Sequence, residues 1–195
     1  MGNRSIEDFI LSVKNSYKTG VYGNIYQGIY INEIPYRFKK CQLFDGKATI
    51  YLPVVFQDMD EKSKKIKYPS VKRPQIIKTS DDQHINLCFS ILEENLEMSQ
   101  VDKACRQIKD AFLQIHMVEN YLIERCDQND TNIFSWFTYV KPTIDGSIYV
   151  HYFLTAVDGK AVLGMFHCPV REKEPWKLIM REIMMSFSQV NGEEK

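Results

Sequence analysis

The most constraining feature of this chain is a run of four long apolar segments set between two amphipathic helical patterns in its second half. The segments carry apolar residues at both odd and even positions, so both faces of the sheet that they form are apolar. Such a sheet must be covered on both faces, which predicts helices above and below it. The expected elements are a helix over Ser99–Met117, strands over about 119–127, 131–141, 147–157 and 160–168, and a helix over Glu174–Phe187.

Both helical patterns place their apolar residues on one stripe, with charged residues at the remaining positions. Ser99 and Asp102 have the spacing of a capping box at the start of the first helix. Pro175 lies near the first turn of the second, where a missing N–H costs nothing. The predicted buried stripes are Val101, Ala104, Cys105, Ile108, Phe112 and Ile115 in the first helix, and Trp176, Ile179, Met180, Ile183 and Phe187 in the second.

The first half of the chain predicts a helix followed by shorter strands. Ser5 and Asp8 have capping-box spacing and open a helix that runs to about Tyr17. Asp45–Gly46, between alternating apolar runs, is a strong hairpin signal. The expected strands cover 22–33, 36–44, 47–53, 75–80 and 83–92, and residues 57–74 are expected to form a loop without periodicity.

The order of these elements is similar to that of a known family. A strand ends in Leu-Pro followed by an aromatic residue (YLPVVF, Tyr51–Phe56), two strands precede a long helix, antiparallel strands follow, and the terminal helix ends in MMSF. This resembles the fold shared by the nuclear-import factor Mog and the photosystem extrinsic protein PsbP, over about residues 47–190. The resemblance implies a twisted antiparallel sheet with helices on both faces, and a role in binding other proteins without catalysis.

Composition and charge restrict the function further. The 195 residues have zero formal net charge, so general attraction to nucleic acid or to an anionic membrane is not expected. The five cysteines are scattered and show no CxxC pair, and we interpret them as buried, reduced thiols in a cytoplasmic protein. No run approaches 18 apolar residues, so we expect no membrane span.

Common catalytic motifs are absent from the sequence. It contains no G-x-x-x-x-G-K-[ST], G-x-S-x-G or H-E-x-x-H, and the adjacent acidic pairs Asp81–Asp82 and Glu93–Glu94 lie in turns or at element ends. We therefore expect no catalytic residue, no metal site and no cofactor. An aromatic group in the strands could line a ligand pocket, but core packing is the usual role of such side chains. Its members are Trp136, Phe137, Tyr139, Tyr149, Tyr152 and Phe153.

The histidines are the remaining candidates for chemistry. If Asp158–Gly159 is a two-residue turn, His151 pairs with Phe166 and His167 with Val150, so the two rings lie on opposite faces and cannot share a metal. The same register puts Cys168 diagonal to His151. A Cys–His dyad there is an alternative, although nucleophilic cysteines usually lie at helix N-termini or in exposed loops. His84 and His116 lie near the ends of elements.

The candidate partner-binding loop lies within residues 58–74, where basic residues outnumber acidic ones in an otherwise neutral protein. A basic loop can dock an acidic partner or an anionic surface, and an ordinary solvated loop is the alternative. Tyr68 is the only aromatic residue inside the run, which disfavours single-stranded nucleic acid. The candidate residues are Lys62, Lys64, Lys65, Lys67, Lys72 and Arg73.

We therefore expect an α/β (α+β) protein with an antiparallel sheet of about six or seven strands and helices on both faces. Residues 1–46 form an N-terminal helix and strand extension, and residues 47–195 form the α/β/α sandwich core of one compact domain. The expected function is that of a non-enzymatic protein-binding or accessory domain. Two alternatives stay open. One is a small-molecule-binding protein or unrecognised enzyme with an aromatic-lined pocket, and the other is a self-associating structural subunit, active as a homo-oligomer.

Overall fold

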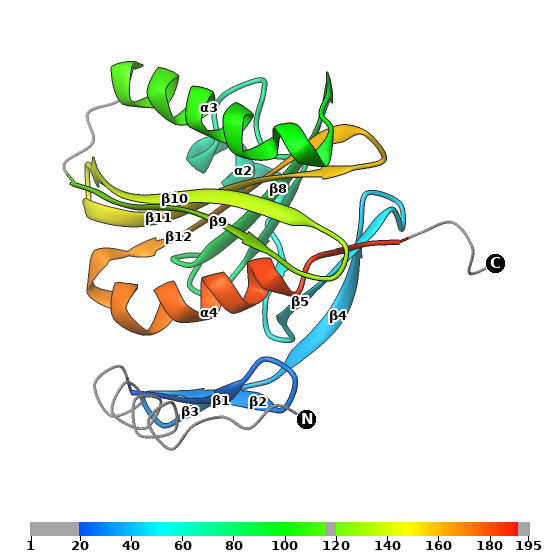
Figure 1. The fold of residues 1–195 in the computed structure, drawn as a ribbon. Helices are drawn as coiled ribbons and strands as arrows, with labels where there is room; N and C mark the ends of the chain where they lie inside the picture. Colours follow the sequence, from blue (N-terminus) through cyan, green and yellow to red (C-terminus); the bar gives the residue numbers. More distant parts are fainter. Residues whose placement is uncertain (1–19, 116–119, 191–195) are drawn as a thin grey trace.

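The structure is a computed structural model that describes residues 20–115 and 120–190 (Figure 1). The helix predicted over residues 5–17 and His116 lie outside the described residues. The strands are β1 (Val21–Asn24), β2 (Gly28–Ile31), β3 (Ile34–Tyr36), β4 (Phe38–Leu43), β5 (Ala48–Pro53), β6 (Gln57–Asp58), β7 (Ile76–Thr79), β8 (Asn86–Asn95), β9 (Asn120–Gln128), β10 (Ile133–Thr143), β11 (Gly146–Val157), β12 (Lys160–Pro169) and β13 (Ser188–Gln189). The helices are α2 (Glu61–Lys67), α3 (Val101–Ile115) and α4 (Lys173–Met185), with 3-10 turns η1 (Met98–Gln100) and η2 (Val170–Glu172).

A seven-stranded antiparallel sheet forms the centre of the fold, with strand order β6-β7-β8-β12-β11-β10-β9. Asp158 and Gly159 both have positive φ, 51° and 70°, as the two-residue turn between β11 and β12 requires. His151 pairs with Phe166 and Val150 with His167. The predicted register of this hairpin is therefore confirmed.

Helix α3 packs on one face of this sheet. Val101 and Cys105 are buried there, and Ala104, Ile108 and Phe112 pack against the same cluster. The sheet contributes alternate side chains of its central strands to this cluster. They are Phe137 and Tyr139 from β10, Val150, Tyr152, Leu154 and Ala156 from β11, and Ala161 from β12.

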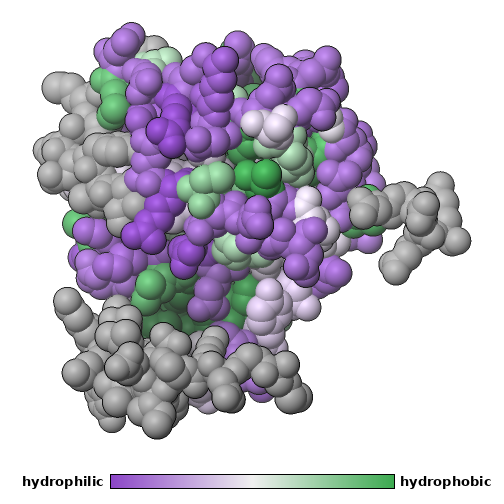
Figure 2. Space-filling model, viewed as in Figure 1, coloured by the Kyte–Doolittle hydropathy of each residue, from purple (hydrophilic) through white to green (hydrophobic). Residues whose placement is uncertain are grey.

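Helix α4 packs on the side chains that point the other way from these strands, such as Phe134, Phe153 and Phe166. All five predicted residues of its apolar stripe are buried. On its far side α4 meets two small sheets, β13-β5-β4 and β1-β2-β3 (Figure 1). Figure 2 shows hydrophobic side chains in the hollow between α4 and β1–β3, where Ile25 and Met185 line a cavity of about 360 Å³.

The segment predicted as one strand over 22–33 is two strands, β1 and β2, joined by a turn. The side chain of Asn24 accepts hydrogen bonds from the backbone N–H groups of Tyr26 and Gln27, and Gly28 has φ of 104°. An Asx turn of this kind reverses the chain. The prediction was wrong because apolar and polar residues keep alternating through the turn, so the sequence pattern shows no break between the two strands.

The prediction of a loop over 57–74 was wrong for residues 57–58 and 61–67, and residues 68–74 do form a loop. Gln57–Asp58 pairs with β7, and α2 begins at Glu61, where Asp60 accepts a hydrogen bond from the N–H of Ser63 at 2.9 Å. The segment is held against the sheet by Met59, which is buried with Ile77 and Cys88. A seven-residue helix with no buried residue of its own leaves no apolar periodicity to detect.

Two smaller expectations also fail. The capping box before α3 is formed by Glu97 and Gln100 at η1, because the chain enters the helix through a 3-10 turn. All five cysteines are free, but Cys41 is half-buried and Cys126 exposed, contrary to their interpretation as buried thiols. Both lie on edge strands, β4 and β9, which leave side chains open to solvent.

Candidate functional site

A cleft of about 670 Å³ opens on the same face of the large sheet as α3. The end of α2 and the β7–β8 turn form one wall, and the β10–β11 hairpin and η2 form the other. Its floor consists of side chains from four neighbouring strands, β8, β12, β11 and β10. They include Asn86, His167, Val150 and Tyr139.

His167 and Asn86 lie side by side on the floor, because they are paired across β12 and β8. The Asn86 Nδ2 donates to the carbonyl oxygen of Gln83 at 3.1 Å, which fixes the orientation of the amide. The Asn86 Oδ1 and the His167 Nδ1 are buried, and neither has a hydrogen-bond partner among the described residues. Buried polar atoms are nearly always paired, so two neighbouring exceptions mark this floor as unusual.

The other nitrogen of His167 belongs to a chain of hydrogen bonds. Its Nε2 lies 2.6 Å from the hydroxyl oxygen of Tyr68, and the Cys88 Sγ donates to the same oxygen at 3.3 Å. Burial raises the pKa of the Cys88 thiol to about 12 and raises the pKa of Tyr68. Both groups therefore keep their protons at neutral pH.

His167 is neutral in the folded protein. Burial, together with the charges of Lys67 and Lys141, lowers its pKa to about 4. With the thiol donating to Tyr68, the phenol hydrogen points to Nε2, since an O–H···N bond suits the 2.6 Å separation. We therefore assign the ring proton to Nδ1, which makes the unpaired nitrogen a hydrogen-bond donor.

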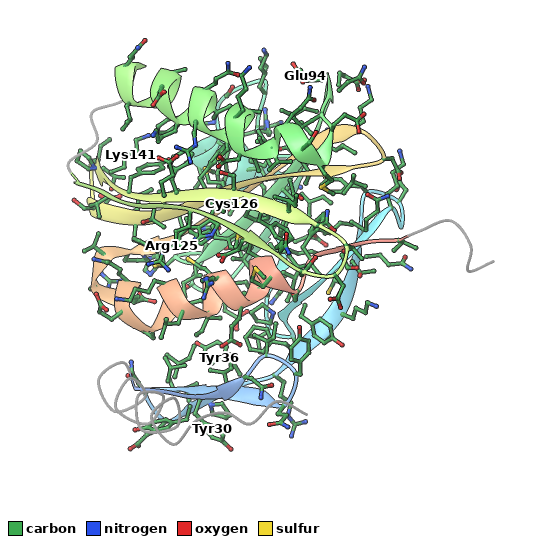
Figure 3. All side chains as sticks on the ribbon, viewed as in Figure 1. Tyr30, Tyr36, Glu94, Arg125, Cys126 and Lys141 are labelled. Atoms are coloured by element: carbon green, nitrogen blue, oxygen red, sulfur yellow. The ribbon has the colours of Figure 1, made fainter. Side chains whose placement is uncertain are left out.

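The rim of the cleft carries more positive than negative charge. Lys67, Lys141 and Arg171 line it, with Asp145 as the opposing carboxylate. Lys141 lies near the end of β10, on the side of the sheet that faces α3 (Figure 3). Lys67 donates to the carbonyl oxygen of Gln83, and Arg171 is 3.6 Å from Glu172. The arrangement favours a ligand with negative charge.

The structure separates the residues of the candidate partner-binding loop. Lys62, Lys64, Lys65 and Lys67 lie on α2, and Lys72 and Arg73 follow it. Only Lys67 lines the cleft. Lys64 pairs with Glu61 at 2.8 Å, whereas Lys62, Lys65 and Lys72 are exposed and Arg73 is half-buried. Lys141 and Arg171 come from distant parts of the chain, so sequence reasoning missed them.

The other sequence candidates lie away from the cleft or serve the core. His151 is buried on the opposite face and stacks on Trp136, with ring centroids 4.8 Å apart. Cys168 is buried, and burial raises its pKa to about 12, so the alternative of a Cys–His dyad has no reactive thiol. His84 is half-exposed, 3.2 Å from Asp82, at the mouth of the cleft. Of the aromatic group in the strands, only Tyr139 lines the cleft, and all six are buried.

Neither a metal site nor a membrane segment is found in the described part of the chain. Residues 20–115 and 120–190 contain no group of three His, Cys, Asp or Glu side chains that could hold a metal ion. No helix in these ranges has the length and apolar character needed to cross a bilayer.

No family model matches the chain, and no curated protein matches it. Solved structures do. The cyanobacterial PsbP (CyanoP) of Synechocystis sp. PCC 6803 is 11% identical with a TM-score of 0.55, and the match covers 78% of this chain and 92% of that chain. LpqN of Mycobacterium tuberculosis, described as involved in cell envelope biogenesis, is 8% identical with a TM-score of 0.50 and covers 98% of this chain and 100% of its own. The Saccharomyces cerevisiae Ran-binding protein Mog1p is 12% identical with a TM-score of 0.48, and the match covers 80% of this chain and 97% of that chain.

At these identities the likeness concerns the fold alone. The predicted resemblance to the Mog/PsbP family is confirmed at that level, as an α+β fold built mostly of antiparallel sheet.

Proposed function

We propose that this protein is a non-enzymatic accessory protein that binds a partner protein at the face containing the cleft. The observation that carries the proposal is that cationic and apolar side chains line the cleft together. Lys67, Lys141 and Arg171 share it with Ile148, Val150 and Met165. Ile66, Ile144 and Val170 are exposed by 70%, 102% and 37%, and each is the sequence neighbour of a residue that lines the cleft. Exposed apolar side chains near a concave site are typical of protein-binding surfaces.

The protonation states in the cleft favour binding over catalysis. A thiol with a pKa of about 12 is a poor nucleophile at neutral pH, because almost none of it is thiolate. An imidazole with a pKa of about 4 is a weak general base, and general-base catalysis works best with a pKa near the working pH. Neither group is therefore activated for catalysis, and the hydrogen bonds through Tyr68 fix the position of His167 in the cleft.

The remaining basic residues of α2 extend the same surface. Lys62 and Lys65 are exposed beside the cleft wall that α2 forms, and a surface of one sign speeds the encounter with a partner of the opposite sign. The five free cysteines support a reducing, cytoplasmic setting for this encounter. The likeness to CyanoP supports the fold on which the face is built, and supplies no partner.

The test is site-specific photocrosslinking in native cell extract. A photoreactive phenylalanine replaces Ser147, which lines the cleft, or Leu178, which is exposed on α4 at the opposite face. We expect one defined protein adduct from position 147 and none from position 178, and the purified partner should bind the unmodified chain. An identical adduct from both positions, or none from position 147, would contradict the proposal. An adduct with the protein itself would favour the self-associating alternative instead.

A further inference from the structure

The central sheet ends in an edge strand, β9, which pairs with β10 on one side. On its other side β9 has no strand partner among the described residues. Its pairing with β10 is regular from Ile123 to Gln128, and the register shifts beyond Ile123, between Thr138 and Tyr139. An edge strand presents a row of backbone N–H and C=O groups to which a further strand can pair. Residues 123–128 therefore form a regular segment that can accept one.

The side chains of this segment point alternately to the two faces of the sheet. Cys126 pairs with Ser135, whose hydroxyl donates to Asp102 of α3 at 3.0 Å, so Cys126 lies on the α3 face. Arg125 pairs with Trp136, which belongs to the cluster around α4, so Arg125 lies on the α4 face. Both side chains are exposed, and Figure 3 labels them on the strand between α3 and α4.

A second copy of this chain can pair with the segment only in certain registers. Two copies of one strand, paired antiparallel through a two-fold axis, place one residue directly opposite itself. An axis at Glu124, Arg125 or Asp127 would set like charges directly opposite each other, which is destabilising. An axis at Ile123 would run the pairing through the shift in register, and an axis at Gln128 would run it past the end of β9.

We propose that this protein forms a symmetric dimer, in which the β9 strands of two copies pair antiparallel about a two-fold axis at Cys126. In this register Arg125 lies opposite Asp127 of the partner subunit, and symmetry repeats the pair. Opposite charges that face each other across two strands stabilise the pairing. Arg125 forms no ion pair with another described residue, whereas Asp127 lies 3.0 Å from Arg181, so the second arginine joins an existing carboxylate site. This self-complementary order of charges favours a second copy over a foreign strand.

The dimer joins the two large sheets into one and leaves the clefts open. Its axis is perpendicular to the joined sheet, so both α3 helices lie on the same face. The cleft opens on that face, and the dimer therefore presents two clefts on one side. Cys126 pairs with Ser135 near the start of β10, whereas Lys141 lines the cleft near the end of that strand.

The first experiment traps the two cysteines that face each other at the axis. Directly opposite residues of an antiparallel pair have Cα atoms about 4.5–5.5 Å apart, within the range that a disulfide spans. Diamide oxidises the two Cys126 thiols to one disulfide, and is itself reduced to the hydrazine by the two electrons and two protons. Cys41 is the other cysteine that is not buried, so its removal is the control.

We expect rapid formation of a disulfide-linked dimer by the wild type and by Cys41→Ser, and little by Cys126→Ser. Equal yields from the two variants would overturn the proposal, because the thiols would then meet by random collision. Failure of Cys41→Ser to form the linked dimer would overturn it as well.

The second experiment follows the dimer without oxidant, by sedimentation equilibrium of the reduced full chain. The mass should rise with concentration from 22.9 kDa toward twice that value. Arg125→Glu sets like charges opposite each other at two places, and should raise the dissociation constant of the dimer about tenfold or more. Lys103→Glu makes the same change of charge at an exposed position of α3, and should change it by less than about twofold. Equal effects of the two variants would overturn the register.

A foreign strand at the same edge is the alternative occupant, and it gives a different result. The purified chain would keep the monomer mass at every concentration, which would overturn the dimer. The photocrosslinking test is separate, because Ser147 lines the cleft and not the β9 edge. A monomeric chain that still yields a partner adduct from Ser147 would leave the proposed function standing.

Discussion

His151 should make the stability of this protein strongly dependent on pH. The ring is 1% exposed, stacked on Trp136 and parallel to Phe166 at 6.1 Å, and its Nδ1 has no partner among the described residues. Burial and the charge of Arg181 lower its pKa to about 3, against a smaller opposing effect of the Asp127 carboxylate. In the unfolded chain the pKa returns to about 6.5.

The magnitude follows from the difference between these two pKa values. Between pH 6.5 and about 3 the unfolded chain binds a proton at this position and the folded protein does not, so the free energy of unfolding falls with falling pH. The loss is about 1.4 kcal/mol per pH unit, which gives roughly 2 kcal/mol at pH 5. His167, with a pKa of about 4, adds a similar loss over the same range. Above about pH 7.5 neither ring contributes a pH dependence, because the unfolded imidazoles are then also neutral.

The substitution His151→Phe isolates the contribution of His151 to the pH dependence. It keeps an aromatic ring in the stack and removes the titrating group. Urea denaturation followed by tryptophan fluorescence at pH 7.5, 6 and 5 gives the free energy of unfolding of each protein. Between pH 7.5 and 5 the two histidines should together contribute a loss of about 4 kcal/mol in the wild type, and His167 a loss of about 2 kcal/mol in the variant. The difference between the two curves cancels the titration of groups that they share, such as the carboxylates.

A constant effect of the substitution on packing does not matter, because only the change in the free energy of unfolding with pH is compared. Parallel curves for the two proteins would refute the reasoning, since they would mean that His151 binds a proton equally well in both states.

Three further predictions concern the core and the thiols. Gly164→Ala should destabilise the fold by at least about 2 kcal/mol in urea denaturation, because an added Cβ would lie 1.8 Å from the Phe153 ring; an unchanged midpoint would count against this packing. Asp127→Ala should lower the free energy of unfolding by about 1–3 kcal/mol in the same assay. The buried Trp136 Nε1 donates to this carboxylate at 2.8 Å, and Arg181 pairs with it at 3.0 Å. A loss below about 0.5 kcal/mol would show that neither contact stabilises the fold. Labelling of the native protein with a thiol reagent should modify two cysteines quickly and protect three until unfolding, and rapid labelling of a protected one would contradict the burial found here. The fast pair is Cys41 and Cys126, and the protected set is Cys88, Cys105 and Cys168.

The central sheet could be predicted from the sequence where local signals determined it. The Asp158–Gly159 turn set the register of the β11–β12 hairpin, and the spacing of apolar residues in α4 identified its buried stripe. Both signals act over short distances along the chain. The order in which the hairpins join has no such signal, so the pairing of β8 with β12 was not predictable from pattern alone.

The residues of the candidate site are brought together by this pairing between strands, which the sequence pattern does not reveal. His167 and Asn86 are neighbours only because β12 pairs with β8. Lys67 and Lys141 line the same cleft only because the chain brings the end of α2 next to the sheet. The anchor of α2 is a capping residue, Asp60, and one buried side chain, Met59, neither of which produces a periodic pattern. Counting charges in the 58–74 segment therefore identified Lys67 but grouped it with lysines that lie outside the cleft.

Recognition at the cleft is tested most directly by the dissociation constants of two variants for the partner crosslinked from Ser147. Lys141→Ala and Lys72→Ala remove the same charge, and only the first removes it from the cleft. We expect Lys141→Ala to weaken the complex by about fivefold or more, and Lys72→Ala to stay within about twofold of the wild type. Equal affinities for the two variants would contradict this expectation, since they would place recognition outside the cleft.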